Sequence, residues 1–491
     1  MFLARLLVLF SLVCISCAHS SFEQKQLKHA LDFAASNRLE LEILLQHYTY
    51  DSLKLEAAKF LIRNMPHCYS YQQGGEMDSV KRVRTYYSPF GQIDQTYARR
   101  WGHYTYRNLP KIYDAHIITA EYLIDNIDRA FDNWQKRPWN RSLSFEDFCE
   151  YLLPYRIGDE PLEEWRELYE KKYGYLLDSI YKGGDVVEAA NLVSRHLQEP
   201  VFIYCEDFEL PHIGPRYLFS HRYGSCVDAA DIVTYAFRAV GIPCMEDTDA
   251  RGGHVWNVVR DTTGRDVPIW YIASEAVRGS RDTGGYKRGK VYRPMYGFQE
   301  EKAAHLGDDW KSMPLLFYHP YMKDVSYAYY PDTLRILTGI PDDEVCYLAH
   351  FHEAHWWSCA CARSASGKME IPNLESELVY LPMKYTKSNY YPSDFPFWFA
   401  GGEINTFLPD WEKTVKVRLY RKYPVYGWLR SFMGHVVGGT FEGSMTKDFE
   451  DGKRLYEIAD TPVIARNRIF LNKPVKCRYI CLLYTSPRPR D

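Results

Sequence analysis

Two residues of this sequence, Cys226 and His254, stand in surroundings suited to nucleophilic catalysis. Cys226 follows Gly224 and Ser225 and begins a segment whose apolar residues recur at helical spacing, so we expect it in the first turn of a helix. The helix dipole and the free backbone N–H groups of a first turn favour a thiolate. His254 precedes Val-Trp-Asn-Val-Val, a run typical of a strand that can hold an imidazole beside that turn. A thiol and an imidazole placed in this way predict an activated nucleophile.

The elements that should position these two residues can be read from the neighbouring sequence. Ser225 can cap the helix, and Gly241 with Pro243 should end it. A strand after His254, a turn over residues 261–265 and a returning strand from Asp266 predict a β-hairpin next to the helix. The apolar positions that predict the helix are Val227, Ala230, Ile232, Val233, Ala236, Phe237 and Val240.

Together these motifs resemble a known family. Gly-Ser-Cys, a helix that ends in Arg-Ala-Val-Gly-Ile-Pro, and Gly-His-Val-Trp-Asn are similar to the transglutaminase-like core of the papain-type Cys-His-Asp superfamily. The resemblance implies an α+β core in which Cys226 attacks an acyl carbon and His254 shuttles the proton. It also implies an acidic residue, on the strand after His254, that orients the imidazole.

The acidic residue of that triad is the point where this sequence departs from the family. The returning strand reads Trp-Tyr-Ile-Ala-Ser-Glu from position 270 and offers no Asp after the Trp. Folding the hairpin about Thr263 places residues near Ile269 to Tyr271 opposite His254. We expect Glu275 to be the acidic member, with Asp266 as second choice and a site without an acid as the remaining alternative.

Two functions of different class fit these residues. The first is a cell-envelope thiol hydrolase, a peptidase or amidase, acting on peptide, glutamine-amide or glycopeptide substrates. Hydrolysis is favoured over transamidation because nothing in the sequence suggests a calcium site, and no cofactor or metal is expected. The alternative is a non-catalytic lipoprotein that binds glycan or peptide on a degenerate transglutaminase-like scaffold.

Composition narrows the class of protein. The chain has 491 residues, a net charge of −3, 46% hydrophobic residues and 16% aromatic residues. This length predicts two to four domains, and the nearly neutral charge argues against a nucleic-acid partner. The aromatic content suits β domains that bind carbohydrate.

Both ends of the chain carry distinctive segments. A cationic start and a short apolar run lead to Cys-Ile-Ser-Cys, which resembles a bacterial lipobox and predicts lipidation of Cys17 and an outer-membrane anchor. A plain signal peptide cut after Ala18 is the alternative. The last residues, 481–491, resemble a translated sequencing-adapter tail, so we expect the natural sequence to depart from this one near Ile480. The nine cysteines that remain without Cys14, Cys17 and Cys481 show no spacing typical of a disulfide framework.

The expected fold is α+β, with a helical N-terminal module, a transglutaminase-like or papain-like core, and β-sandwich domains after it. The expected segments are 1–17 (lipoprotein signal peptide), 18–130 (helical module), 131–307 (core), 308–405 (β-sandwich), 406–480 (truncated galactose-binding, discoidin-like fold) and 481–491 (non-native tail).

Other residues able to do chemistry receive structural interpretations. Cys149 should lie on the apolar face of a helix, and His212 and His221 should have packing or surface roles. His350, His352, His355, Cys359 and Cys361 crowd into a dozen residues and could bind zinc. Their His-Glu-Ala-His spacing does not match the helical zinc motif, so exposed histidines on a strand and loop are the favoured interpretation.

Overall fold

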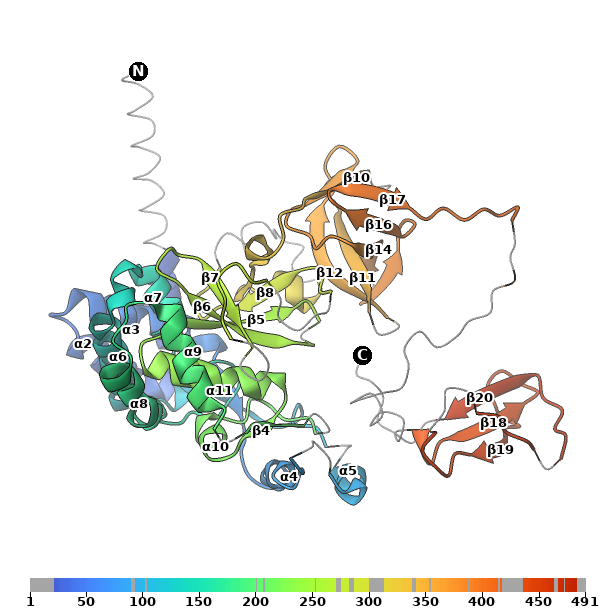
Figure 1. The fold of residues 1–491 in the computed structure, drawn as a ribbon, viewed down its shortest axis with the longest axis horizontal. Helices are drawn as coiled ribbons and strands as arrows, with labels where there is room; N and C mark the ends of the chain where they lie inside the picture. Colours follow the sequence, from blue (N-terminus) through green and yellow to red (C-terminus); the bar gives the residue numbers. More distant parts are fainter. Residues whose placement is uncertain are drawn as a thin grey trace. The chain divides into compact units, whose positions relative to one another are not determined.

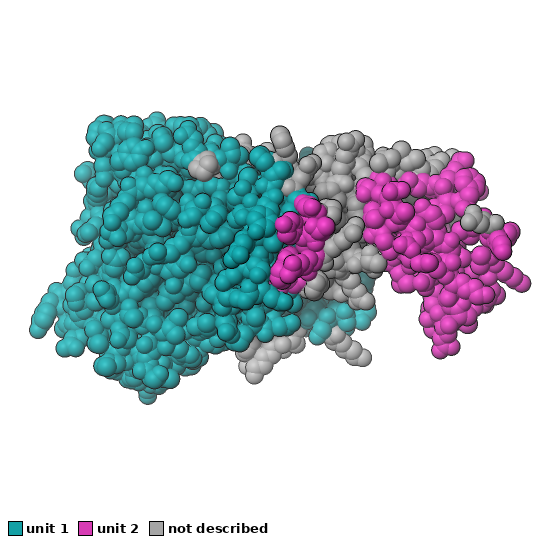
Figure 2. Space-filling view, turned by 90° about the horizontal axis from the view of Figure 1, so that it is seen from below, with its two compact units in different colours: residues 1–93, 105–408 teal, residues 94–104, 409–491 magenta. Residues whose placement is uncertain are grey.

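The computed structural model describes the chain from residue 22 to residue 483 with gaps. The described ranges are 22–89, 93–101, 104–199, 201–205, 208–251, 253–270, 275–281, 287–299, 313–337, 341–352, 355–386, 388–413, 416, 436–462, 467–471 and 473–483. They mix helix and sheet, as an α+β fold requires. Their contacts form two compact units, residues 1–93 with 105–408 and residues 94–104 with 409–491 (Figure 2). The predicted signal peptide and Cys17 lie outside the described residues, and no described helix is long and apolar enough to cross a membrane.

The first part of the first unit is helical, as predicted, because its leucines and alanines recur at helical spacing and meet in one core. Asp51, Thr119 and Ser144 cap three of these helices with their side chains. Cys149 is buried in this core, in agreement with its predicted structural role. The elements are η1 (Ala35–Asn37), α2 (Arg38–His47), α3 (Ser52–Asn64), η2 (Met65–His67), β1 (Tyr69–Tyr71), α4 (Glu76–Arg84), β2 (Lys111–Tyr113), η3 (Asp114–His116), α6 (Ala120–Lys136), η4 (Pro138–Ser142) and α7 (Phe145–Tyr151).

A second group of helices surrounds the helix that begins at Cys226. These elements are α8 (Arg166–Tyr175), η5 (Leu176–Ile180), α9 (Val186–Leu197), β3 (Ile203–Tyr204), α10 (Pro215–Ser220), β4 (Tyr223–Gly224) and α11 (Cys226–Ala239). Asp185 caps α9 with its carboxylate. All but one residue of α11 is buried, so α11 is the central helix of this unit rather than a surface helix with one apolar face.

A five-stranded antiparallel sheet with the order β7-β6-β5-β8-β9 lies against α11 and α9 (Figure 1). Its strands are β5 (Cys244–Asp249), β6 (Val255–Arg260), β7 (Asp266–Ile269), β8 (Val291–Pro294) and β9 (Met322–Asp324). Alternate residues of β6 serve its two faces: Val259 packs with α11, and Val258 packs with Tyr329 on the opposite face.

The remainder of the first unit is β-rich, and we call residues 334–406 the β-rich region. Two short strands, β10 (Leu334–Leu337) and β13 (Lys368–Ile371), pack their apolar residues onto one face of a six-stranded sheet. That sheet contains β11 (Val345–His352), β12 (His355–Arg363), β14 (Leu378–Thr386), β15 (Asn389–Pro392), β16 (Phe397–Ala400) and β17 (Glu403–Thr406). The short helices α13 (Leu315–Tyr318) and η7 (Ser326–Ala328) precede it. The predicted boundary between residues 405 and 406 falls inside β17, which still pairs with β16, and the first unit ends at residue 408.

The second unit contains a three-stranded sheet with the order β19-β18-β20. Its elements are α5 (Gln95–Trp101), β18 (Thr440–Ser444), β19 (Lys453–Glu457) and β20 (Tyr479–Leu483). Three apolar side chains of this sheet, Tyr456, Ile480 and Leu483, are exposed. Residues 417–435 lie outside the described residues.

Candidate functional site

Cys226 is the first residue of α11, where the sequence predicted it. Ser225 precedes it in an extended conformation, and the carboxylate of Asp228 accepts hydrogen bonds from the backbone N–H and the hydroxyl of Ser225, at 2.8 and 3.2 Å. This reciprocal cap fixes the first turn of the helix. Cys226 is 6% exposed, so its thiol lies in a nearly closed environment.

The path of the chain brings His254 to the same end of the sheet as Cys226. After α11, a turn at Gly241 leads into β5, which runs back along the helix: the Thr234 hydroxyl is 2.7 Å from a carboxylate oxygen of Glu246. β6 reverses direction again and pairs with β5 in antiparallel fashion. The residue before β6, His254, therefore lies at the end of the sheet where α11 begins.

Asn257 fixes this alignment. Its side-chain amide donates to the backbone carbonyl of Ala230 at 3.0 Å and to the Thr234 hydroxyl at 2.9 Å. Cys226 precedes Ala230 by one helical turn, about 6 Å of rise. His254 precedes Asn257 by about 10 Å of strand. The helix and the strand thus carry the thiol and the imidazole in the same direction from a shared anchor.

Aromatic rings enclose His254. Trp270 meets the imidazole edge to face with 4.5 Å between ring centroids, and Trp256 lies 5.6 Å away. His254 is 4% exposed. An apolar environment of this kind disfavours a lone imidazolium and strengthens any charge interaction that the ring makes.

The register of the hairpin bears on the acidic residue of the predicted triad. The centre of the hairpin is at Thr263, as predicted, and Asn257 pairs with Ile269. The described pairing ends there, and residues 271–274, which include the predicted Tyr271, lie outside the described residues.

Asp266, the second choice for the acid, occupies the far end of the hairpin. It pairs with Arg260, six residues along from His254, which is about 20 Å of strand. Its carboxylate accepts from Arg293 at 2.8 Å and from the Tyr151 hydroxyl at 3.0 Å. These contacts give Asp266 a structural role at a distance from the thiol.

Glu275, the first choice, pairs with a different helix. Its carboxylate is 2.6 Å from the Arg195 guanidinium, and both side chains are 53% exposed. The next residue, Ala276, exchanges two hydrogen bonds with the Asn191 side chain, at 2.8 and 2.9 Å. The described contacts thus hold Glu275 against α9 at the surface, whereas His254 is buried. The role of Glu275 in orienting His254 stays a prediction.

Sequence reasoning missed a cluster of buried polar side chains beside α11. His212, expected to have a packing or surface role, holds Asp231 at 2.9 Å between its Nδ1 and the carboxylate. Burial lowers the pKa of His212, but Asp231 outweighs it, and the pKa lies well above the usual value. Burial raises the pKa of Asp231 to about 6. The signal available in the sequence was an aspartate at an otherwise apolar helical position.

Glu246 on β5 is a further member of this cluster. Burial and then the charge of Asp231 raise the pKa of Glu246 to about 8. The Thr234 hydroxyl donates to its carboxylate, and the side chain is 7% exposed. Glu246 is therefore largely protonated at neutral pH, which places a neutral acid beneath the helix that carries Cys226.

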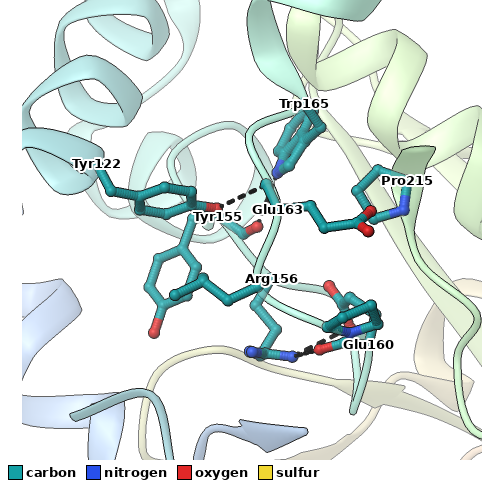
Figure 3. Close-up of a pocket in the computed structure, with 9 residues that line it drawn as sticks. Tyr122, Tyr155, Arg156, Glu160, Glu163, Trp165 and Pro215 are labelled. Atoms are coloured by element: carbon teal, nitrogen blue, oxygen red, sulfur yellow. Dashed lines mark hydrogen bonds and ion pairs between the residues drawn. The ribbon is translucent and has the colours of Figure 1, made fainter. Parts of the chain in front are cut away.

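Two hollows of the first unit lie away from Cys226. One, lined by Tyr122, Tyr155, Arg156, Glu160 and neighbouring residues, leaves no room for a water molecule (Figure 3). A groove of about 300 Å³ lies over α6 and α8 and is lined mainly by charged side chains of both signs. Neither hollow is lined by Cys226 or His254. The groove contains no candidate nucleophile, so we place the candidate site at Cys226 and His254.

The histidine and cysteine cluster of the β-rich region does not assemble a metal site among the described residues. His350 and His352 lie on β11 with 6.3 Å between ring centroids, but no group of three or more potential ligands gathers in the described part of the chain. Cys359 instead contacts the Leu348 carbonyl in the apolar core. The described cysteines are free thiols.

Comparisons of the chain with protein-family models, with curated proteins and with solved structures found no match.

Proposed function

We propose that this chain is a thiol hydrolase, a peptidase or amidase, in which Cys226 is the nucleophile and His254 the general base. The observation that carries the proposal is the shared anchor of α11 and β6, where Asn257 bonds to Ala230 and Thr234. Through it, a cysteine at a helix start and a histidine at a strand start lie at the same end of the sheet.

In the proposed reaction the Cys226 sulfur attacks the acyl carbon of a peptide, glutamine amide or glycopeptide. His254 takes the thiol proton and gives it to the departing amine, which leaves a thioester that water hydrolyses. The backbone N–H of Cys226, at a helix N-terminus, is placed to stabilise the oxyanion. The contacts of Glu275 with Arg195 and of Asp266 with Arg293 make a Cys-His dyad the minimal catalytic unit of this proposal.

The rest of the proposal concerns fold family and location. The helix, hairpin and cysteine support a transglutaminase-like core, and the sheets of the β-rich region support a sandwich attached to it. Lipidation of Cys17 at the outer membrane, and a discoidin-like fold with affinity for carbohydrate in residues 406–480, belong to the proposal on sequence grounds.

Alkylation of the native protein tests the nucleophile without a known substrate. Iodoacetamide at about pH 6, read by peptide mass mapping, should modify Cys226 ahead of Cys149 and Cys244. Burial raises the pKa of the Cys244 thiol to about 12, which makes it a matched buried control. His254→Gln should slow the labelling of Cys226 about tenfold or more. Labelling of Cys226 no faster than of Cys244 would contradict the proposal.

A second function, non-catalytic binding of glycan or peptide, is favoured by the burial of the same two residues. Cys226 and His254 are 6% and 4% exposed, which suits a closed scaffold as well as a covered active site. Under this alternative, Cys226→Ala leaves affinity for peptidoglycan fragments or glycans unchanged, and the wild-type protein releases no amine from them.

A further inference from the structure

Arg84, the last residue of α4, reaches the beginning of α11 from the helical N-terminal part of the chain. Its guanidinium lies 2.9 Å from the Asp228 carboxylate, and both side chains are 4% exposed. A second nitrogen donates to the Phe208 carbonyl at 3.1 Å. The two residues of this ion pair are 144 positions apart in sequence, so the contact exists only in the folded chain.

The Asp228 carboxylate occupies a sensitive position. It lies in the same first turn as Cys226, two residues on, and is held there by the Ser225 backbone N–H and hydroxyl. The approach is so close that a Cβ at Gly224 would lie 2.4 Å from one carboxylate oxygen. A negative charge within a turn of a thiol opposes its ionisation. The cap that fixes the helix start therefore works against a Cys226 thiolate unless its charge is cancelled.

We propose that Arg84 is a positioning residue of the thiol site: by pairing with Asp228 it removes the negative charge at the start of α11 and so keeps Cys226 easily ionised. The inference rests on the proposed function, since it assigns Arg84 a role only if Cys226 reacts as a thiolate. It makes the N-terminal helical part of the chain a working component of the site rather than a separate module.

The other described groups around Arg84 are compatible with this role. Tyr217 and Lys81 lie beside it, and the Lys81 carbonyl accepts a hydrogen bond from the Tyr217 hydroxyl at 2.9 Å. Burial opposes the charge of Arg84, but Asp228 outweighs it, and the pKa of the guanidinium lies above its usual value. Arg84 is thus a permanent cation, and Asp228 is its only carboxylate partner among the described residues.

Two single variants change the net charge of the Arg84–Asp228 pair in opposite directions, and two further variants leave it unchanged. Asp228→Asn keeps an oxygen that can accept from Ser225 and leaves the positive charge of Arg84, so Cys226 should reach half-maximal alkylation at a pH about 1 unit lower than in the wild type. Arg84→Gln leaves the negative charge and should move this pH up by about 1 unit. The double variant has no net charge at this pair, so its pH of half-maximal alkylation should be close to that of the wild type. Arg84→Lys keeps the positive charge, so its pH of half-maximal alkylation should also stay close to the wild-type value.

The measurement is the rate of iodoacetamide labelling of Cys226 in the full chain as a function of pH, with Cys244 as internal control and thermal unfolding recorded for each variant. Shifts in the same direction for Asp228→Asn and Arg84→Gln, or a double variant as far displaced as either single one, would overturn the role of Arg84. If Arg84→Gln does not fold, Asp228→Asn and the double variant still decide the matter. Failure of wild-type Cys226 to outpace Cys244 would instead count against the proposed function itself.

Discussion

The two large sheets of the first unit bury different kinds of side chain. The five-stranded sheet beside α11 buries charges: Arg293 on β8 binds Asp247 on β5 at 2.5 and 2.9 Å and Asp266 on β7 at 2.8 Å, and all three side chains are at most 2% exposed. The Tyr151 hydroxyl completes the cluster through bonds to Arg293 and Asp266. Such a cluster is stable only while every member keeps its partner.

The sheets of the β-rich region bury apolar side chains and leave their ion pairs in water. Phe397, Phe399, Tyr380 and Leu348 form their shared core, whereas the Arg335–Glu370 pair across β10 and β13 is 68% and 58% exposed. The Arg335–Glu370 pair is therefore screened by water, and the sheets of this region depend on buried apolar area rather than on ion pairs.

The comparison shows which elements of the chain are held in one specific arrangement by buried charges. Buried charges lie around α11 and the strands beside it, which are the elements that carry the proposed thiol site. An ion pair buried between strands fixes their mutual position because any slip leaves a charge unpaired in an apolar environment. We infer that the alignment of Cys226 and His254 depends on these pairs, while the β-rich region tolerates substitution better.

The largest effect should come from breaking the buried cluster. Arg293→Met leaves Asp247 and Asp266 buried without their cation and should lower the free energy of unfolding by about 3–5 kcal/mol, measured by urea denaturation. The matched control is Arg335→Met in the β-rich region, where the loss should be about 0.5 kcal/mol or less because water replaces the partner. Equal losses for the two variants would remove the contrast between the sheets.

A smaller effect should follow from the neutral acid beneath α11. Glu246 binds its proton with a pKa of about 8 in the folded chain, against an ordinary value of 4.5. As the pH rises between these values, the unfolded chain loses the proton first, so unfolding is favoured and stability falls. Glu246→Gln should remove this loss and stabilise the protein at pH 8 by an amount on the order of 2–4 kcal/mol. At pH 4 the variant and the wild type should have nearly the same free energy of unfolding.

The smallest effect tests the buried polar group of the β-rich region. Both ring nitrogens of His350 lack a hydrogen-bond partner among the described residues, and burial, followed by the charge of His352, lowers the pKa of His350 to about 4. His350→Leu should therefore stabilise the protein by about 1 kcal/mol at neutral pH. The stabilisation should be larger below about pH 6.5, because protonation of His350 in the unfolded chain then lowers the free energy of unfolding of the wild-type protein. His221→Leu, at an exposed histidine, serves as the control and should change little.

Much of the local structure could be predicted because it depends on neighbours in sequence. The helix from Cys226, with Ser225 before it and Gly241 after it, follows from apolar spacing and end signals. The hairpin centre at Thr263 follows from the turn residues between two β-rich runs. The acidic residue depends on more than its neighbours in sequence: the hairpin and the family resemblance favour Glu275, but Arg195 on α9 holds its carboxylate at 2.6 Å.

The sequence by itself determined where the thiol and the imidazole stand on their own elements, since a helix start and a strand start are set by residues a few positions away. Only the tertiary structure decided which charges surround them. The pairs Arg84–Asp228, His212–Asp231 and Arg293–Asp247 join residues far apart in the chain. The physical reason is that periodicity and capping act through covalent neighbours, whereas the partner of a buried charge is whatever group packing brings within hydrogen-bond distance.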